Sequence, residues 1–262
     1  MDIQTLVVTT GQTDLSLLDK MNIQTDAIVG NQCDRDEILR TSHGRKKLLW
    51  LSMQERGVGL NRNMVFMRAT ADICVFADDD MVFYDGYPEV VRELFEKYPE
   101  ADMIVFDLDE DRPRRKKLTK VKRVGRSNYG RYGAARLALR REPVQMAGIS
   151  FHLLFGGGAK YGSGEDSIFL HDCIKKGLKV LAVPVAIAKL HDDRPSTWFQ
   201  GYNEKYYFDK GVLYAQIYGW RAPMIALYNC LRHGKGRYKE WGWKRAYGKM
   251  REGIRSVRNG RM

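Results

Sequence analysis

The sequence has no paired cysteine motif and no long apolar run, and we expect no leader peptide. Its four cysteines, at positions 33, 74, 173 and 230, are too far apart for a CxxC metal or redox pair, so we interpret them as reduced thiols of a cytosolic protein. Met1 leads directly into an alternating apolar run, which argues against a secretory signal. The longest apolar stretch, residues 180–188, is about half the ~20 residues that cross a bilayer. We therefore expect a cytoplasmic protein, with any membrane contact peripheral and on the inner face of the cell membrane.

Net positive charge is confined to two segments of the chain. Of the formal net charge of +12, residues 110–126 carry +7 and residues 232–262 carry +9, which leaves the remainder mildly acidic. Two separate basic patches suggest that each has its own anionic partner, although two solvated surfaces would give the same pattern. The hydrophobic share of 44% and the charged share of 29% are those of a globular chain.

Strand and helix patterns alternate along the first part of the chain. We expect strands at residues 3–9, 26–31, 47–51, 72–77, 103–107 and 180–188, and helices at 14–21, 60–70, 87–98 and 165–176. Residues 110–143 are expected to form a basic loop with a hairpin around 117–124, and the chain turns helical after residue 195. This order predicts an α/β fold with a mostly parallel central sheet flanked by helices.

Three of the predicted strands end in groups that could bind a ligand. These groups are Thr9-Thr10, Asn31-Gln32 and Asp78-Asp79-Asp80. In open α/β sheets the ligand lies beyond the carboxyl ends of the strands, so we expect the three ends to meet at one crevice. Adjacent carboxylates repel one another, and a divalent cation such as Mg²⁺ or Mn²⁺ relieves that repulsion. The alternative is an acidic cap for the next helix, for which one Asp would suffice.

Two helix starts carry further candidates. Arg62 and Asn63 lie in the first turns of a predicted helix, where free N–H groups and a guanidinium suit a diphosphate or a nucleotide base, or serve only as a cap. Gly164-Glu165-Asp166 begins another helix, where acids are ordinary but could also take a proton from a hydroxyl. His191, after the strand at 180–188, is either structural or a metal ligand.

An aromatic and polar segment follows at residues 194–207. It includes Trp198 and suits a sugar ring, although packing of a helix on the sheet would explain it equally well.

Together these residues resemble the family-2 inverting glycosyltransferases with a GT-A fold, of the bacterial surface-polysaccharide type. The resemblance rests on the order of a strand, Asp78-Asp79-Asp80, Gly164-Glu165-Asp166 and then His191, and it covers residues 3 to about 211. It implies a GT-A domain at 1–211 that moves a hexosyl group from a nucleoside-diphosphate sugar, with UDP as the expected nucleotide, to a hydroxyl of a glycan or lipid-linked glycan.

The resemblance also implies a role for each residue. Asp166 would be the general base, assisted by Glu165, and Asp78, Asp80 and His191 would hold Mn²⁺ or Mg²⁺. The donor pocket would comprise Thr9, Asn31, Arg62, Asn63, Asp78 and Asp79. Gly164 and Trp198 would contact the acceptor. Many relatives have an acid at the end of the second strand, where this chain has Asn31-Gln32.

Residues 212–262 are expected to form a helical, basic C-terminal extension. Trp243, Tyr247, Met250, Ile254 and Val257 fall on one helical stripe among basic residues. Such a helix fits an anionic membrane surface, or it packs on the domain.

Three other functions remain open from the sequence. A metal-dependent nucleotidyltransferase also combines a sheet, carboxylates and Mg²⁺, but Thr9-Thr10-Gly11-Gln12 lacks its Gly-rich basic loop. A nucleic-acid-binding protein would explain the basic composition, but the patches carry no recognition motif, and we expect no nucleic-acid partner. Nothing in the sequence excludes an inactive scaffold.

Overall fold

The computed structural model describes residues 1–110, 117–191, 201–234, 236 and 238–260, which form two compact units. The first unit comprises Met1–Leu153 and Glu165–Pro195, and the second comprises Leu154–Gly164 and Ser196–Met262. The boundary expected after residue 211 lies inside one continuous helix, α6 (Glu204–Tyr218). The helical second unit therefore begins earlier in the chain than predicted.

The first unit alternates strands and helices, as the sequence predicts. Its strands are β1 (Ile3–Thr10), β2 (Asp26–Gln32), β3 (Glu37–His43), β4 (Lys46–Met53), β5 (Ile73–Asp78), β6 (Met81–Phe83), β7 (Met103–Glu110), β8 (Lys122–Val124), β9 (Leu137–Arg140) and β10 (Val180–Leu190). Its helices are α1 (Ser16–Lys20), α2 (Val58–Phe66), α3 (Tyr87–Lys97), α4 (Arg141–Met146) and α5 (Glu165–Lys175), with 3-10 turns η1 (Tyr129–Arg131) and η2 (Ala134–Arg136).

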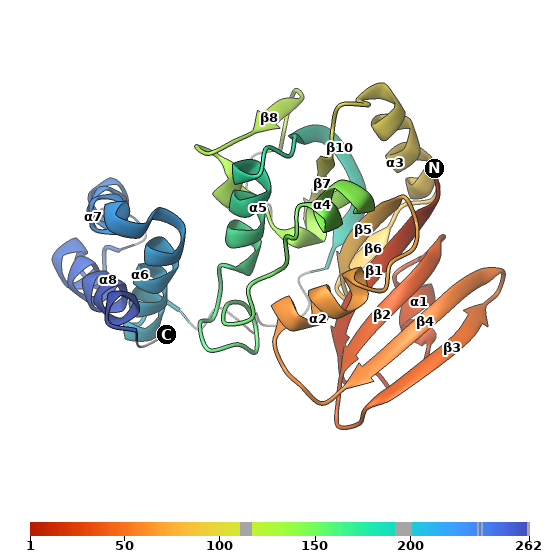
Figure 1. Ribbon diagram of the computed structural model, residues 1–262, viewed down its shortest axis with the longest axis horizontal. Helices are drawn as coiled ribbons and strands as arrows, with labels where there is room; N and C mark the ends of the chain where they lie inside the picture. Colours follow the sequence, from red (N-terminus) through yellow and green to blue (C-terminus); the bar gives the residue numbers. More distant parts are fainter. Residues whose placement is uncertain (111–116, 192–200, 235, 237, 261–262) are drawn as a thin grey trace. The chain divides into compact units, whose positions relative to one another are not determined.

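In the described part of the chain these ten strands form one sheet in the order β3-β4-β2-β1-β5-β9-β7-β10-β6, with β8 paired to β10 (Figure 1). The pairs β1–β2, β1–β5, β2–β4 and β7–β10 are parallel. The strands β3, β6, β8 and β9 all pair antiparallel. The sheet is therefore mixed and not mostly parallel, because the four strands that the sequence did not reveal all run against their neighbours.

Successive side chains of a strand point to opposite faces of the sheet, and in the central strands both sets are apolar. On β1, Val7 belongs to the core under α1 and α3, whereas Leu6 points to the other face. That second face packs through Phe76 of β5, whose ring contacts Phe66 of α2 and Phe151, at centroid distances of 6.0 and 5.4 Å. Helices therefore cover both faces of the sheet.

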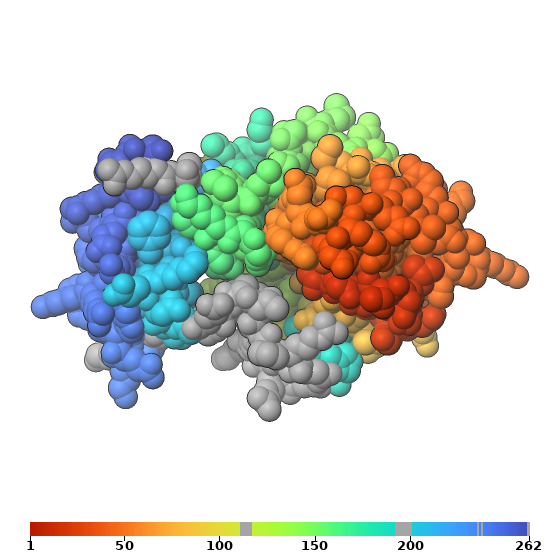
Figure 2. All heavy atoms as spheres, turned by 90° about the horizontal axis from the view of Figure 1, so that it is seen from below, coloured from red at the N-terminus to blue at the C-terminus, as the bar shows by residue number. Residues whose placement is uncertain are grey.

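Two of the additional strands, β3 and β8, differ from what the sequence indicated. The edge strand β3 is exposed on both faces, so its residues show no apolar alternation, and its hairpin with β4 projects from the surface (Figures 1 and 2). The hairpin expected around 117–124 is wrong, because β8 pairs with β10 and not with its own neighbour in the chain.

The second unit is a small helical cluster. It contains α6, the 3-10 turn η3 (Gly219–Arg221), α7 (Ala222–His233) and α8 (Trp243–Arg258). A Cβ on Gly211 of α6 would lie 2.0 Å from the Met250 carbonyl oxygen, and one on Gly253 of α8 would lie 2.2 Å from the Phe208 carbonyl oxygen. The two helices therefore touch backbone to backbone. None of the described helices is both long enough and apolar enough to cross a bilayer.

The apolar stripe of α8 serves this internal packing. Met250 and Ile254 are buried at 0% and 2% exposure, and Tyr247 and Val257 pack against the same cluster from its edge. Of the two alternatives that the sequence left open, the structure therefore has the packed helix. A membrane contact through the Met250–Ile254 side of α8 is wrong, because those side chains are covered by the unit itself.

Candidate active site

The strand ends meet at one edge of the sheet, as expected. In the parallel ladders, Val8 of β1 lies opposite Asp78 of β5, and Thr9 lies opposite Asn31 of β2. The Thr9 hydroxyl donates to the Asp79 carboxylate at 2.6 Å and so links the two strand ends. Thr9 and the aspartates after β5 therefore lie at the same opening.

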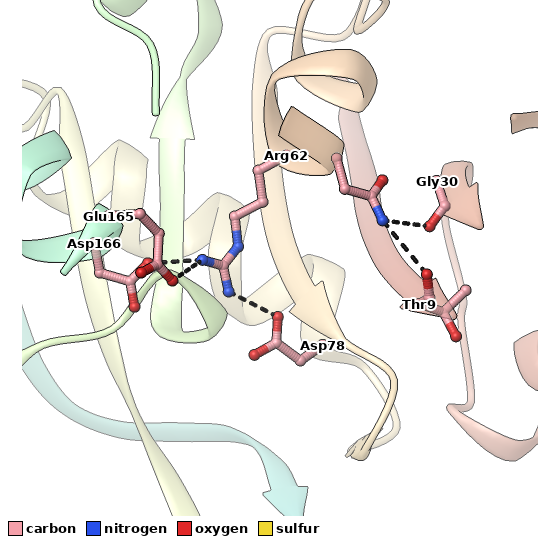
Figure 3. Close-up of polar contacts among 7 residues, drawn as sticks. Thr9, Gly30, Arg62, Asp78, Glu165 and Asp166 are labelled. Atoms are coloured by element: carbon pink, nitrogen blue, oxygen red, sulfur yellow. Dashed lines mark hydrogen bonds and ion pairs between the residues drawn. The ribbon is translucent and has the colours of Figure 1, made fainter. Parts of the chain in front are cut away.

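A buried arginine lies at the centre of this edge. Arg62, on α2, donates to the carboxylates of Asp78 at 3.0 Å, Glu165 at 3.0 Å and Asp166 at 2.7 Å (Figure 3). Its side chain is 4% exposed, whereas the carboxylates of Asp78 and Asp166 are 37% and 25% exposed. Arg62 therefore joins the end of β5 to the start of α5, and the two carboxylates keep an open side.

Arg62 has other partners in the structure than the diphosphate that its place in the sequence suggested. Its side chain is buried, and its two terminal nitrogens donate to three carboxylates. Neighbouring Asn61 holds the helix in place by donating to the carbonyls of Gly30 at 2.8 Å and Thr9 at 3.4 Å. A Cβ on Gly30 would lie 1.8 Å from the Asn61 side chain, so glycine is required there.

The charges of this cluster perturb two ionisations. Burial opposes the charge on Arg62, but the three carboxylates outweigh it and raise the pKa of Arg62 above its usual value. Burial is also the largest influence on Asp166, and with Glu165 and Asp78 it raises the pKa of Asp166 to about 7, although Arg62 acts in the opposite direction. The pKa of Asp166 therefore lies near neutral pH and well above the ordinary carboxyl value of about 3.9.

Two supports of Asp166 were not visible in the sequence. The backbone N–H of Ala134, in η2, donates to the Asp166 carboxylate, and a Cβ on Gly133 would lie 3.2 Å from that carboxylate. Below Arg62, the ring of Phe151 stacks on Phe169 of α5 at a centroid distance of 4.1 Å. No motif marks residues 133, 134 and 151, because their role comes from long-range packing.

Two predicted donor-pocket residues have structural partners. Asn31 is fully buried, and its amide pairs with the backbone N–H and carbonyl of Gln12 at 3.0 and 2.9 Å. Asn63 pairs in the same way with the backbone of Phe151, at 2.8 Å in both directions. Both side-chain amides therefore pair with backbone groups in the structure, and the contact with a nucleotide that we expected of them stays a prediction. Asn31 instead fixes the loop that follows β1.

His191 lies beside the aspartates, as expected. Its backbone N–H donates to the Asp80 carbonyl at 2.9 Å, and Leu190 pairs with Met81 across β10 and β6. Within the described residues, no group of three or more His, Cys, Asp or Glu side chains is arranged to hold a metal ion. Asp78, Asp80 and His191 carry oxygen and nitrogen donors at this edge of the sheet, but their side chains do not form such a group, so the cation site expected for them stays a prediction.

The two residues expected to contact the acceptor have different outcomes. Gly164, in the second unit, has a positive φ of +127°, and a Cβ there would lie 2.7 Å from Leu213. Glycine at this position is therefore explained by the backbone and by the close side chain of Leu213. Trp198 lies outside the described residues.

Comparison with known proteins identifies the fold. No family model matches the chain, and no curated protein matches its sequence. Its structure is similar to that of residues 1–349 of S. aureus TarS in complex with UDP-GlcNAc, with a TM-score of 0.65, 12% identity, and coverage of 99% of this chain and 92% of that one. The same TarS segment with UDP gives a TM-score of 0.62 at 13% identity and the same coverage, and a longer TarS chain gives 0.62 at 14%, with 92% of this chain and 45% of that one covered. These likenesses show that the chain has the GT-A-like α/β fold, as its sequence predicted.

Proposed function

We propose that this protein is an inverting glycosyltransferase that moves a hexosyl group from a nucleoside-diphosphate sugar to an acceptor hydroxyl. The observation that carries the proposal is the convergence of Asp166, Glu165 and Asp78 on Arg62, at the edge of the sheet where the aspartates after β5 meet His191. Carboxylates from distant segments, two of them partly exposed, lie together at the ends of the strands, and we assign the base and the cation site to them.

The proposed donor is a UDP-sugar. The similarity to structures of TarS bound to UDP-GlcNAc and to UDP supports this class of ligand for the same fold. In this chain the ends of β1 and β5, joined by the hydrogen bond between Thr9 and Asp79, are the proposed place for the nucleotide, because ligands of such sheets lie beyond the strand ends.

Asp166 is the proposed base. Its carboxylate takes the proton of the acceptor hydroxyl as that oxygen forms a bond to the anomeric carbon. The bond from this carbon to the diphosphate oxygen breaks on the opposite face, and the electron pair leaves with the nucleoside diphosphate. A single displacement inverts the anomeric configuration. A pKa of about 7 lets Asp166 be ionised in a large fraction of molecules at neutral pH and still hold the proton that it receives.

Arg62, Glu165 and Ala134 are positioning residues in this proposal. Arg62 and the backbone N–H of Ala134 donate to the Asp166 carboxylate, and Glu165 holds Arg62 by accepting a hydrogen bond from the same guanidinium nitrogen. We assign Asp78, Asp80 and His191 as the residues that would hold Mn²⁺ or Mg²⁺. The cation would supply positive charge to the leaving diphosphate.

A glycan or lipid-linked glycan is the proposed acceptor, reached on the cytoplasmic side of the membrane. The contacts of Gly164 and Trp198 with the acceptor remain part of this proposal, although the close approach of Leu213 gives Gly164 a structural reason of its own. We also propose that the protein takes part in building a surface polysaccharide.

Paired measurements on Asp166→Asn test the function. We expect UDP binding, measured by calorimetry with Mn²⁺, to stay near that of the unchanged protein, and transfer to be lost. Release of UDP, and not pyrophosphate, from a UDP-sugar separates this reaction from nucleotidyl transfer. Near-normal turnover of Asp166→Asn would refute the assignment of the base, and failure to bind UDP at all would refute the donor class.

A further inference from the structure

Helix α7 has one apolar side that faces its own unit and a second apolar side that faces solvent. Ala222, Ala226 and Cys230 are all 0% exposed and belong to the core that α7 shares with α6 and α8. Their spacing of four residues keeps them on one side of the helix. The fully buried side chains of α7 are therefore small, and Ile225 adds a partly buried contact to the same core.

Four exposed large apolar side chains of this segment lie on the other side. Met224, Tyr228 and Leu231 follow a spacing of four and three residues, and Trp220 of η3 precedes them by four. Their exposed fractions are 71% for Trp220, 55% for Met224, 57% for Tyr228 and 58% for Leu231. We call these four residues the α7 outer face. Single exposed apolar residues are ordinary, but four along one helical face indicate an interaction surface.

Arginines line the edges of the α7 outer face. The guanidinium of Arg232 donates to the Tyr228 hydroxyl at 2.7 Å, and that of Arg221 lies over the Trp220 ring at 5.1 Å. Arg258, from α8, donates to the Trp220 carbonyl at 3.4 Å. Cations are therefore present at both ends of the apolar row.

Acidic residues are missing from the same stretch of sequence. Between Lys210 and Lys239 there is no Asp or Glu, and residues 232–262 carry eleven Lys or Arg against two acids. An apolar row with cationic edges and no acid in its own stretch of sequence complements a surface whose interior is apolar and whose rim is negative. An anionic lipid bilayer has that composition.

We propose that the α7 outer face docks the protein on the surface of an anionic membrane. Trp220 and Tyr228 have rings with a polar end, which suits the boundary between headgroups and acyl chains, and Met224 and Leu231 enter the acyl region between them. The three arginines contact lipid phosphates. At twelve residues, α7 is about 18 Å long, so it lies on the bilayer and does not cross it.

A second copy of this chain is a less suitable occupant. A symmetric contact between two α7 outer faces would bring Arg221, Arg232 and Arg258 of each copy toward those of the other, with no acid on this segment to offset them. The charge pattern therefore favours a lipid surface over self-association.

Vesicle flotation tests the proposal with the full-length protein and no nucleotide, so its outcome is independent of the proposed enzymatic function. We expect binding to vesicles of phosphatidylglycerol and phosphatidylcholine, and little binding to phosphatidylcholine alone. The double variant Met224→Ser/Leu231→Ser should bind the anionic vesicles about tenfold less tightly or worse, because two inserted apolar side chains are lost. Raising the salt concentration should weaken binding by the unchanged protein.

The matched control is Met67→Ser/Met146→Ser. These side chains are 72% and 80% exposed and lie in the first unit, so the variant removes a similar apolar surface elsewhere. It should bind vesicles as the unchanged protein does. Circular dichroism and the thermal midpoint check that both double variants are folded.

A second measurement locates the contact. Lipids brominated in their acyl chains should quench tryptophan fluorescence on binding, and Trp220→Phe should remove most of that quenching. Equal binding by both double variants, or no preference for anionic vesicles, would overturn the proposal. So would a dimer of the unchanged protein that Met224→Ser/Leu231→Ser converts to a monomer without any vesicle binding, which would assign the face to self-association.

Discussion

The Arg62 guanidinium lies 2.7 Å from the Asp166 carboxylate, although 104 positions separate the two residues in the sequence. The same guanidinium contacts Asp78 and Glu165, so the cluster holds one positive and up to three negative charges in a largely buried place. Because like charges in a protein interior repel strongly, the state of each member depends on the others.

Replacement of Arg62 by methionine should destabilise the fold. The variant keeps most of the volume but leaves three carboxylates without their cation, which costs about 3–5 kcal/mol in comparable buried pairs. Urea unfolding at pH 8 measures the loss, and at pH 5 the loss should be smaller because protonation relieves the repulsion.

Arg45→Met is the control for this change. Arg45 is exposed in the turn between β3 and β4, and its removal should change the free energy of unfolding by less than about 0.5 kcal/mol. Equal effects of the two substitutions would mean that Arg62 does not hold the cluster together.

Transfer activity should depend on pH through Asp166. A base acts in its deprotonated form, and burial raises the pKa of Asp166 to about 7. We therefore expect kcat/KM to fall about tenfold per pH unit below pH 7 and to reach a plateau above it. A rate profile from pH 5 to 9 measures this limb. An acidic limb near pH 4 would show instead that Asp166 titrates as an ordinary carboxyl group.

The free energy of unfolding should decrease as the pH rises, whereas transfer activity should increase, and the proton on Asp166 causes both changes. Since the pKa of Asp166 is raised on folding, the folded state binds a proton that the unfolded chain has already released at neutral pH. This contribution is fully present below the unfolded-state pKa and is lost as the pH rises through about 7. Denaturant unfolding at a series of pH values measures this effect. The free energy of unfolding should decline more steeply with pH for the unchanged protein than for Asp166→Asn, which cannot titrate at this position.

Metal dependence should reside in the aspartates after β5. If Asp80 binds the cation, Asp80→Ala should abolish the stimulation of transfer by Mn²⁺, and calorimetric titration of Mn²⁺ with UDP should show weaker binding. Asp34→Ala removes a carboxylate whose side chain is 93% exposed and should leave both measurements unchanged. Full Mn²⁺ stimulation in Asp80→Ala would exclude this residue as a ligand.

Two glycines of α8 should respond in opposite ways to the same substitution. Gly253→Ala places a Cβ 2.2 Å from the Phe208 carbonyl oxygen and should cost about 1–3 kcal/mol or more, since backbone must move. At Gly248 a Cβ meets no atom within 4 Å, so Gly248→Ala should stabilise the helix by about 0.5–1 kcal/mol. Thermal and urea unfolding of the two variants compare them directly.

The sequence predicted the parts of this molecule that depend on local pattern. The strand before Asp78, the helix beginning at Glu165 and the position of His191 beside Asp80 follow from apolar periodicity and from the rule that ligands gather at strand ends. The parts that it missed depend on distant neighbours. The place of Arg62 near the start of a helix does not reveal in which direction its guanidinium points. The exposed strand β3 has no buried face, so its sequence shows no apolar pattern.

The same limit explains β9. Its four residues, Leu137–Arg140, are too few to show a period, and they pair with β5 and β7, which lie far from them in the chain. The raised pKa of Asp166 also needs three dimensions, because it arises from burial beside acids of two separate segments.

Strand β9 runs antiparallel between β5 and β7, so it starts at the edge of the sheet where those two strands finish. The residues just ahead of it are thereby delivered to Asp166, and Ala134 reaches the carboxylate with its backbone alone. The contact therefore does not depend on which side chain Ala134 carries. The connection from Val124 to Leu137 is thus a place where insertions or deletions could retune the acidity of Asp166 while every strand of the sheet keeps its register.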